Sequence, residues 1–255
     1  RAQIITREDT KVELEGDVTF KGQAKETHNT AAAIFVEQGK LTFDTNEYEM
    51  VVSDYTNGLR VGYADKDSRG TADAEFYLKG NGTFDIEKSV QTPTGSSYVA
   101  DDVFPKESGV KGSGIALMAS KKYQRLLTVD GATLKSNENA AFGVYRHNID
   151  SNAYRNKEMQ PVVLKNDAQV YIEDNASTGY YDESYCENGN NLEVLDSYLS
   201  IRYNGDNGYG YGAAGGSKKT EIGRNQLFQG SEIHMDNNRN TNAFFYSAKT
   251  VIDDT

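Results

Sequence analysis

A short pattern of apolar and polar positions recurs along the whole chain. Each copy has an apolar residue, a turn rich in Gly, Asp or Asn, and then two apolar residues separated by one other residue. Residues 14–20 read Leu-Glu-Gly-Asp-Val-Thr-Phe, and residues 78–86 read Leu-Lys-Gly-Asn-Gly-Thr-Phe-Asp-Ile. A spacing of two places both apolar side chains on one face of a β-strand. Because Gly and Asn form turns readily, the pattern predicts short strands joined by tight turns.

The first apolar residue after each turn is an anchor on which the copies can be aligned. The anchors are Val18, Leu41, Phe84, Leu134, Val170, Leu199 and Ile233, with spacings of 23, 43, 50, 36, 29 and 34 residues. Six of the seven have an apolar residue two positions later, and the exception is Leu134, which is followed by Ser136. Val251 begins an eighth copy that stops at Thr255, so we expect more copies to follow in a longer protein.

A second motif, in which a polar or small residue leads into another apolar pair, follows the anchors. It occurs at residues 30–34, 57–61, 112–117, 139–144, 178–180, 207–211 and 242–245. Each repeat therefore holds at least two strands, and no repeat can bury its apolar face alone. Uneven spacing fits stacked coils whose loops differ in length. We expect one all-β domain over residues 1–255, a right-handed parallel β-helix, with a β-sandwich of short strands as the alternative.

Composition and charge narrow the classes of partner. Only 37% of the residues are apolar, whereas Gly (24) and Tyr (17) are abundant and Trp is absent, as suits a β-protein with many turns. The net charge of −11 argues against binding to nucleic acid, which needs clustered Lys and Arg. No apolar run is long enough to cross a bilayer. Cys186 is the single cysteine, so an internal disulfide is excluded. We also expect the segment to be monomeric.

Repeated units such as Gly39-Lys40-Leu41-Thr42-Phe43 and Gly230-Ser231-Glu232-Ile233-His234-Met235 resemble the pectate-lyase-like adhesive β-helix domains of bacterial cell-surface proteins. The resemblance is one of pattern, covers nearly the whole chain and transfers no site residue. It implies a cell-surface or secreted location and binding of a glycan or a host matrix ligand. The expected function is therefore a non-catalytic adhesin or stalk module. A purely structural spacer is a further alternative.

Aromatic residues gather in the C-terminal half of the chain and are the candidates for ligand binding. Their rings can stack on sugars while neighbouring polar groups bind the hydroxyls. The alternative is that the rings stack inside the coils. The candidate ligand-binding residues are Tyr180, Tyr181, Tyr185, Arg202, Tyr203, Tyr209 and Tyr211.

Calcium is the cofactor for which the sequence contains candidate ligands. Residues 65–70, Asp-Lys-Asp-Ser-Arg-Gly, resemble the start of a calcium loop, and the candidate ligands are Asp65, Asp67 and Asp73. The glutamate that such a loop needs at its twelfth position is replaced by Phe76. The sequence otherwise predicts a polar turn here.

The alternative function is a polysaccharide lyase or a glycoside hydrolase of the β-helix type. A lyase would combine calcium with a basic residue, and a hydrolase would use paired carboxylates. The candidates are Asp101, Asp102, Asp253, Asp254, Arg146 and Arg155. The pair at 253–254 occupies the turn position of the repeat, so turn formation alone explains it.

Overall fold

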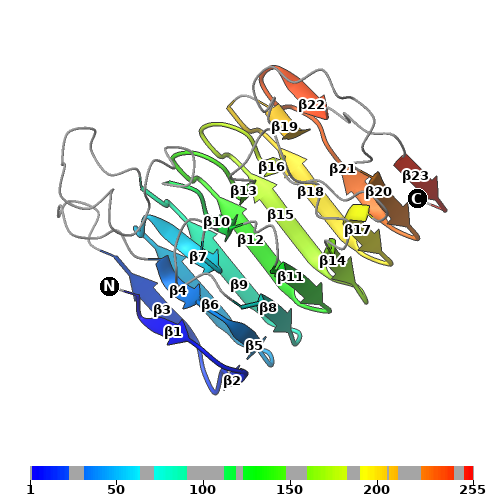
Figure 1. Ribbon diagram of the computed structural model, residues 1–255. Coiled ribbons are helices and arrows are strands. Elements are labelled where there is room, and N and C mark those ends of the chain that lie inside the picture. Colours follow the sequence, from blue (N-terminus) through cyan, green and yellow to red (C-terminus); the bar gives the residue numbers. More distant parts are fainter. Residues whose placement is uncertain are drawn as a thin grey trace.

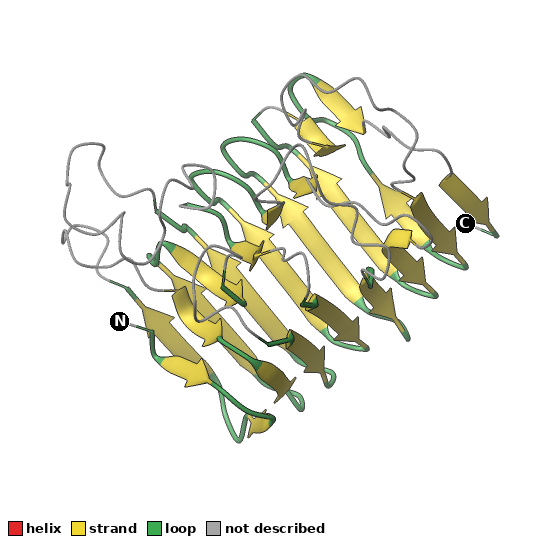
Figure 2. Cartoon of the chain, viewed as in Figure 1, coloured by secondary structure: helices red, strands yellow, loops and turns green. Residues whose placement is uncertain are grey.

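The structure is a computed structural model that describes residues 2–22, 32–63, 72–90, 112–118, 123–147, 160–182, 190–205, 207–211, 225–243 and 250–254. These residues form strands, bends and turns, and no helix occurs among them (Figure 2). Accordingly, this part of the chain contains no helix long and apolar enough to span a membrane. The prediction of an all-β protein is confirmed.

The described strands form three sheets, which we call A, B and C. Sheet A contains β1 (Ile4–Thr6), β4 (Ala32–Val36), β7 (Asn57–Val61), β10 (Ile115–Met118), β13 (Val144–His147), β16 (Tyr180–Asp182), β19 (Asn207–Tyr211) and β22 (Thr241–Ala243). Sheet B contains β2 (Thr10–Glu13), β5 (Gly39–Asp44), β8 (Ala74–Lys79), β11 (Arg125–Asp130), β14 (Val162–Lys165), β17 (Asn190–Leu195), β20 (Asn225–Gln229) and β23 (Thr250–Asp253). Sheet C contains β3 (Val18–Lys21), β6 (Glu49–Ser53), β9 (Thr83–Glu87), β12 (Thr133–Asn137), β15 (Gln169–Glu173), β18 (Tyr198–Arg202) and β21 (Glu232–His234).

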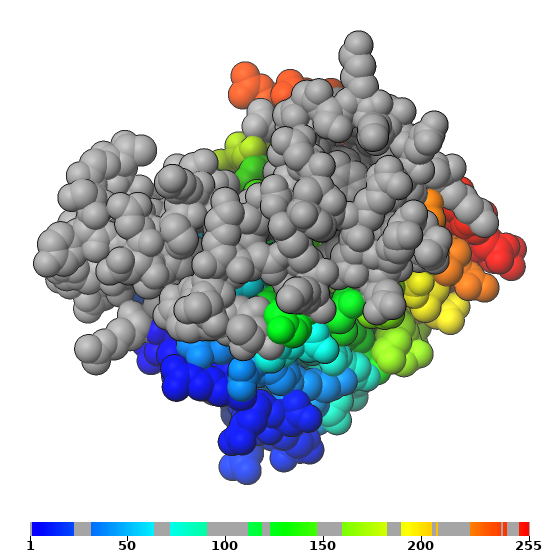
Figure 3. Space-filling view, in the orientation of Figure 1, coloured from blue at the N-terminus to red at the C-terminus, as the bar shows by residue number. Residues whose placement is uncertain are grey.

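Successive described strands belong to successive sheets, and each strand from β1 to β20 pairs with the third strand after it. We call each set of three successive strands, one from each sheet, a rung. The pairs between described strands are all parallel, for example β8 with β11 and β12 with β15. The rungs follow one another from the N-terminus to the C-terminus, which lie at opposite ends (Figures 1 and 3). This arrangement is compatible with a parallel β-helix and differs from the antiparallel sheets of a β-sandwich.

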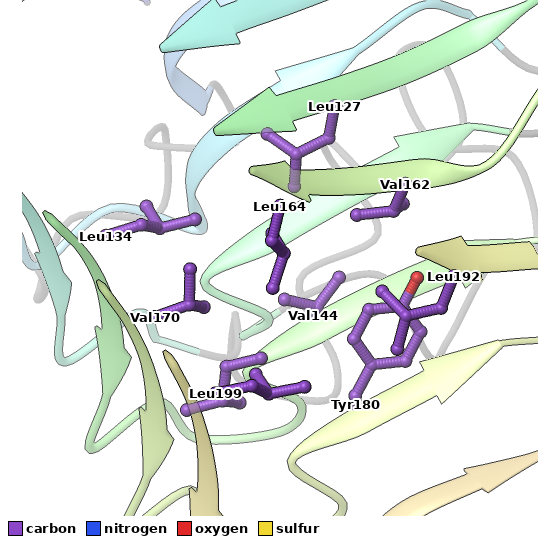
Figure 4. Close-up of a pocket in the computed structure, with 10 residues that line it drawn as sticks. Leu127, Leu134, Val144, Val162, Leu164, Val170, Tyr180, Leu192 and Leu199 are labelled. Atoms are coloured by element: carbon purple, nitrogen blue, oxygen red, sulfur yellow. The ribbon is translucent and has the colours of Figure 1, made fainter. Parts of the chain in front are cut away.

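Alternate residues of each strand face a common interior. In β8 and β11, buried and partly exposed positions alternate strictly, as a strand with one face in the core requires. The inward side chains of all three sheets form one continuous apolar cluster. The space among them is lined by apolar side chains such as Leu127, Leu134 and Val144 (Figure 4). Burial of these side chains, at about 25 cal/mol per Å² of apolar surface, is the main force that holds the rungs together.

The strand register corrects one of the anchors on which the sequence copies were aligned. Leu41 lies in sheet B, where it pairs with Phe76, whereas the other six anchors lie in sheet C. The residue that pairs with both Val18 and Phe84 is Met50. With Met50 as second anchor, the first two spacings become 32 and 34 residues, close to the later ones. Only the step from Phe84 to Leu134 stays long, because residues 91–111 lie within it.

A ladder of asparagines lines the corner between sheets C and A. Its members are Asn139, Asn175, Asn204 and Asn238, one in each of four rungs. The side-chain amide of each donates to Oδ1 of the next, at 2.7, 2.9 and 2.8 Å in turn. The same Oδ1 atoms accept the backbone N–H of the preceding asparagine. Asn175, Asn204 and Asn238 each donate another amide proton to a backbone carbonyl of the preceding rung. The acceptors are the carbonyls of Ser136, Ile172 and Ile201, respectively.

The ladder satisfies polar groups that would otherwise be buried without partners. Asn175 and Asn204 are each 1% exposed. Each uses both amide protons and accepts two hydrogen bonds on Oδ1, which is the full capacity of the side chain. Asn175 also belongs to an Asn-Ala-Ser glycosylation sequon, but its amide is occupied in the ladder.

A glycine follows three of the ladder asparagines by four positions, at Gly143, Gly179 and Gly208. A Cβ on Gly179 would lie 2.6 Å from Asn204 Nδ2 and 2.6 Å from Ile201 Cγ2. A Cβ on Gly143 would lie 2.3 Å from the corresponding isoleucine methyl, Cγ2 of Ile172. The glycines therefore make room for the ladder at the start of β13, β16 and β19.

We expect Gly179→Ala to lower the free energy of unfolding by about 1–3 kcal/mol, because the added methyl group overpacks the corner. Urea unfolding followed by circular dichroism measures the change. Gly16→Ala is the matched control, since a Cβ there meets nothing within 4 Å. Equal stability of the two variants would contradict the role assigned to the glycine.

Candidate functional site

The structure distributes the aromatic candidates over different faces. Tyr180, in β16, faces the interior and is 2% exposed, so its ring packs in the core and cannot contact a ligand. This corrects its prediction as a binding residue. The cause is the alternation of the strand, which turns Tyr180 inward and Tyr181 outward. Tyr185 lies outside the described residues, and only the backbone of Tyr209 and Tyr211, in β19, is described.

Tyr181 belongs to a stack of rings on the outer face of sheet A. Its ring centroid lies 4.9 Å from that of Phe142 and 5.5 Å from that of Tyr145, with interplanar angles of 23° and 21°. Tyr145 is 4% exposed. Because Tyr145 is buried and each of the three rings lies within 5.5 Å of the other two, the rings contribute to packing more than to an accessible surface.

Arg202 and Tyr203 lie together at the end of β18, on the outer side of sheet C. Nε of Arg202 donates to Oδ1 of Asp236 at 2.7 Å, and the guanidinium lies 5.6 Å from the centroid of the Tyr203 ring. The hydrogen bond raises the pKa of Arg202 and lowers the pKa of Asp236. Tyr203 has a φ of 59°, an uncommon conformation for a bulky residue, and is 50% exposed. The turn thus displays an aromatic ring beside an ion pair.

Next to this pair lies a row of rings that the sequence did not single out. We call Tyr171, Tyr198 and His234 the ring row. The centroids of Tyr171 and Tyr198 are 5.3 Å apart, and those of Tyr198 and His234 are 5.5 Å apart. All three are partly exposed and come from the adjacent strands β15, β18 and β21. Alternation could have found them, because Tyr171 and His234 each lie between two inward apolar residues.

Hydroxyl and carboxylate groups connect the ring row to the sheet beneath it. Ser200 is buried, and its Oγ donates to a carboxylate oxygen of Glu173. Burial raises the pKa of Tyr198, while its hydrogen bond with Ser200 opposes that shift. Nε2 of His234 lies 2.6 Å from Oε1 of Glu232. The face therefore combines half-exposed rings with fixed polar groups, an arrangement that can stack on sugar rings and bind their hydroxyls.

A second polar cluster lies on the outer face of sheet B, around Tyr77. The hydroxyl of Tyr77 donates to Asp130, which also accepts from Asn166 at 2.7 Å and pairs with Lys165 at 3.3 Å. The ammonium group of Lys40 lies 4.1 Å from the centroid of the Tyr77 ring. Partial burial and the bond to Asp130 raise the pKa of Tyr77 to about 12. Since these groups are bound to one another, the cluster stabilises the sheet rather than offering free partners.

The raised pKa of Tyr77 predicts a loss of stability in alkali. The unfolded phenol has a pKa of about 10, so the folded state holds its proton more tightly. The stabilisation is complete below about pH 10 and is lost as the pH rises towards 12. We expect the difference in unfolding free energy between the unmodified chain and Tyr77→Phe to shrink over this range, measured by denaturant titration at each pH. A difference that is constant from pH 9 to 12 would contradict the prediction.

The basic and acidic candidates for an enzymatic site do not converge on an accessible surface among the described residues. Arg146 and Asp182 do lie together, with Nη1 and Oδ2 3.8 Å apart, but both side chains are fully buried. Nη1 and Nη2 of Arg146 donate to the carbonyls of Asn191 and Gln160 at 3.0 and 2.6 Å. Arg146 therefore holds the interior corner between sheets A and B and cannot contact a substrate. Asp253 and Asp254 are exposed, and Asp101, Asp102 and Arg155 lie outside the described residues.

Arg125 has a similar role one rung earlier. Its guanidinium donates to the carbonyls of Ala72 and Gln124 at 2.5 and 2.8 Å, and to that of Tyr63 at 3.3 Å. The side chain lies against Gly62, where a Cβ would be 1.8 Å from Nε of Arg125. Buried guanidinium groups thus satisfy backbone carbonyls at this corner.

The calcium candidates are only partly described. Asp65 and Asp67 lie outside the described residues, and Oδ1 of Asp73 accepts the backbone N–H of Gln124 at 2.7 Å. Within the described ranges, no group of three or more His, Cys, Asp or Glu side chains could hold a metal ion. Asp73 therefore has a structural role in joining two rungs.

Comparison with known proteins identifies no relative of this chain. No protein-family model, curated protein or solved structure matches this chain.

Proposed function

We propose that the chain is a non-catalytic, right-handed parallel β-helix module of a cell-surface or secreted protein, and that it binds a glycan through the outer face of sheet C. The observation that carries the proposal is the ring row of Tyr171, Tyr198 and His234 beside the Arg202–Asp236 pair. The right hand is expected because parallel crossover connections almost always have it.

A rigid sheet suits a binding face. β15 and β18 are hydrogen-bonded on both sides, so the positions of Tyr171 and Tyr198 are fixed by the register of the strands. Neighbouring strands lie about 4.8 Å apart, which sets the spacing of side chains along the face. Little conformational entropy is then lost when a ligand binds.

The chemistry of the face matches that of a sugar. A pyranose ring has apolar C–H faces, which pack on aromatic rings, and hydroxyl groups around its edge. Arg202 offers donors, while Glu173 and Asp236 offer acceptors. The net charge of −11 keeps such a module soluble.

We expect Tyr171→Leu and Tyr198→Leu each to weaken glycan binding by on the order of tenfold, equivalent to about 1.4 kcal/mol of lost ring contact. The ligand is first identified on an array of glycans and matrix proteins, with and without Ca²⁺, and affinities are then measured by calorimetry. Tyr77→Leu, on the outer face of sheet B, is the matched control and should leave the affinity unchanged. Thermal unfolding establishes that each variant is folded.

Two outcomes would overturn the proposal. Unchanged affinity in both sheet C variants would remove the site. Release of reducing ends or unsaturated products from a bound glycan would instead support the lyase or hydrolase alternative.

A further inference from the structure

We infer that the outer face of sheet C selects glycans that carry protonated amino groups over glycans that carry carboxylates. This inference rests on the proposed function and narrows its ligand class. It follows from the charges around the ring row and from which of them are already paired.

The accessible charges beside the ring row are mainly negative. The side chain of Glu232 is 70% exposed and that of Asp236 is 39% exposed, whereas that of Arg202 is 28% exposed. The guanidinium of Arg202 is bound to Asp236 at 2.7 Å. Lys135, on the neighbouring strand β12, lies 3.6 Å from Asp85. Arg202 and Lys135 therefore each have a carboxylate beside them, and the ring of His234 lies between the carboxylates of Glu232 and Asp236, at 2.6 and 4.0 Å.

The carboxylate of Glu232 and the ring of Tyr198 belong to paired residues on adjacent strands of sheet C. Glu232 of β21 pairs directly with Tyr198 of β18, and His234 pairs with Ser200. Paired residues of adjacent strands are separated by the strand spacing of about 4.8 Å. A ligand amine above Tyr198 would therefore meet both an aromatic ring and the exposed carboxylate of Glu232, whose Oε1 lies 2.6 Å from Nε2 of His234.

An ammonium group gains from both neighbours. It is attracted to the negative face of an aromatic ring, and an adjacent carboxylate adds a charge-assisted hydrogen bond. A uronic acid in the same place would bring a third carboxylate close to Glu232 and Asp236. Like charges brought together across an interface are unfavourable, so this ligand is disfavoured.

The test uses three soluble oligosaccharides of equal length, titrated by calorimetry at pH 6 in low salt. They are a β-linked glucosamine oligomer with free amines, its fully N-acetylated form, and a uronic acid oligomer. We expect the free amine form to bind about tenfold more tightly than the N-acetylated form, and the uronic acid form to bind weakest. The preference should decrease at high salt, because exposed charges are screened.

Glu232→Gln separates charge from shape. It should bring the affinity ratio of the amine and N-acetylated forms close to one. Glu193→Gln, in β17 of sheet B, is the matched control and should keep the ratio. Equal affinities for the two forms, or a ratio unchanged by Glu232→Gln, would overturn the inference while leaving glycan binding intact. Failure of all three oligosaccharides and of the glycan array to bind would instead overturn the proposed function.

Discussion

Replacing Asn175 with alanine is expected to lower the free energy of unfolding by roughly 3–5 kcal/mol, because several buried polar groups lose their partners at once. The backbone N–H of Asn139 and the carbonyl of Ser136 both bind the Asn175 side chain. Oδ1 of Asn204 also accepts one of its amide protons, at 2.9 Å. Each buried group left without a hydrogen bond costs about 1–3 kcal/mol.

Urea unfolding of Asn175→Ala measures the loss, and Asn81→Ala is the matched control. Asn81 is exposed in the turn between β8 and β9, so its replacement should change stability by less than about 0.5 kcal/mol. If Asn175→Ala were as mild as the control, the ladder would have no energetic role.

We expect the second large loss of unfolding free energy from removing the charge of Asp182. Asp182→Asn removes the carboxylate that lies 3.8 Å from the buried guanidinium of Arg146, and the expected loss of unfolding free energy is about 3–5 kcal/mol. The substitution keeps the shape of the side chain, so the effect reports charge rather than a cavity. Thermal and urea unfolding at neutral pH both measure it.

A double-mutant cycle with Arg146→Met tests whether the two side chains act as a pair. Replacing both members removes the uncompensated charge, so the double variant should be more stable than Asp182→Asn alone. Losses that simply add in the double variant would mean that the pair is not coupled. Arg202→Met is a control for general effects of removing an arginine, since Arg202 is partly exposed and lies in another sheet.

The repeat pattern predicted the fold class because its signals are local. Alternation within a strand and Gly or Asn at a turn are both visible in a few consecutive residues. The misplaced anchor Leu41 shows where this local information fails. The turn before Met50 has Asn46 at a φ of 50° and contains no glycine, so the true copy was not recognised.

The candidate ligand-binding residues were predicted less well. Whether a side chain faces the core or the outside depends on where its strand begins. Tyr180 and Tyr181 are adjacent, and only the register with Val144 and Tyr145 assigns the first to the core and the second to the outside. The pairing of Arg146 with Asp182 joins residues 36 positions apart, which no local pattern indicates. The asparagine ladder, by contrast, had a readable signal in the repeated Asn-x-x-x-Gly spacing at Asn139, Asn175 and Asn204.

The pairing of each strand with the third strand after it has a mechanical consequence. The two termini lie at opposite ends of the stack, so a pulling force between them runs along the hydrogen bonds that join the rungs (Figure 1). Such a force separates paired strands one after another instead of shearing many hydrogen bonds together. Most rungs have 29–36 residues, and each of these would release roughly 100–120 Å of extended chain. Under tension the chain would lengthen in discrete steps at its ends while the remaining rungs kept their binding face.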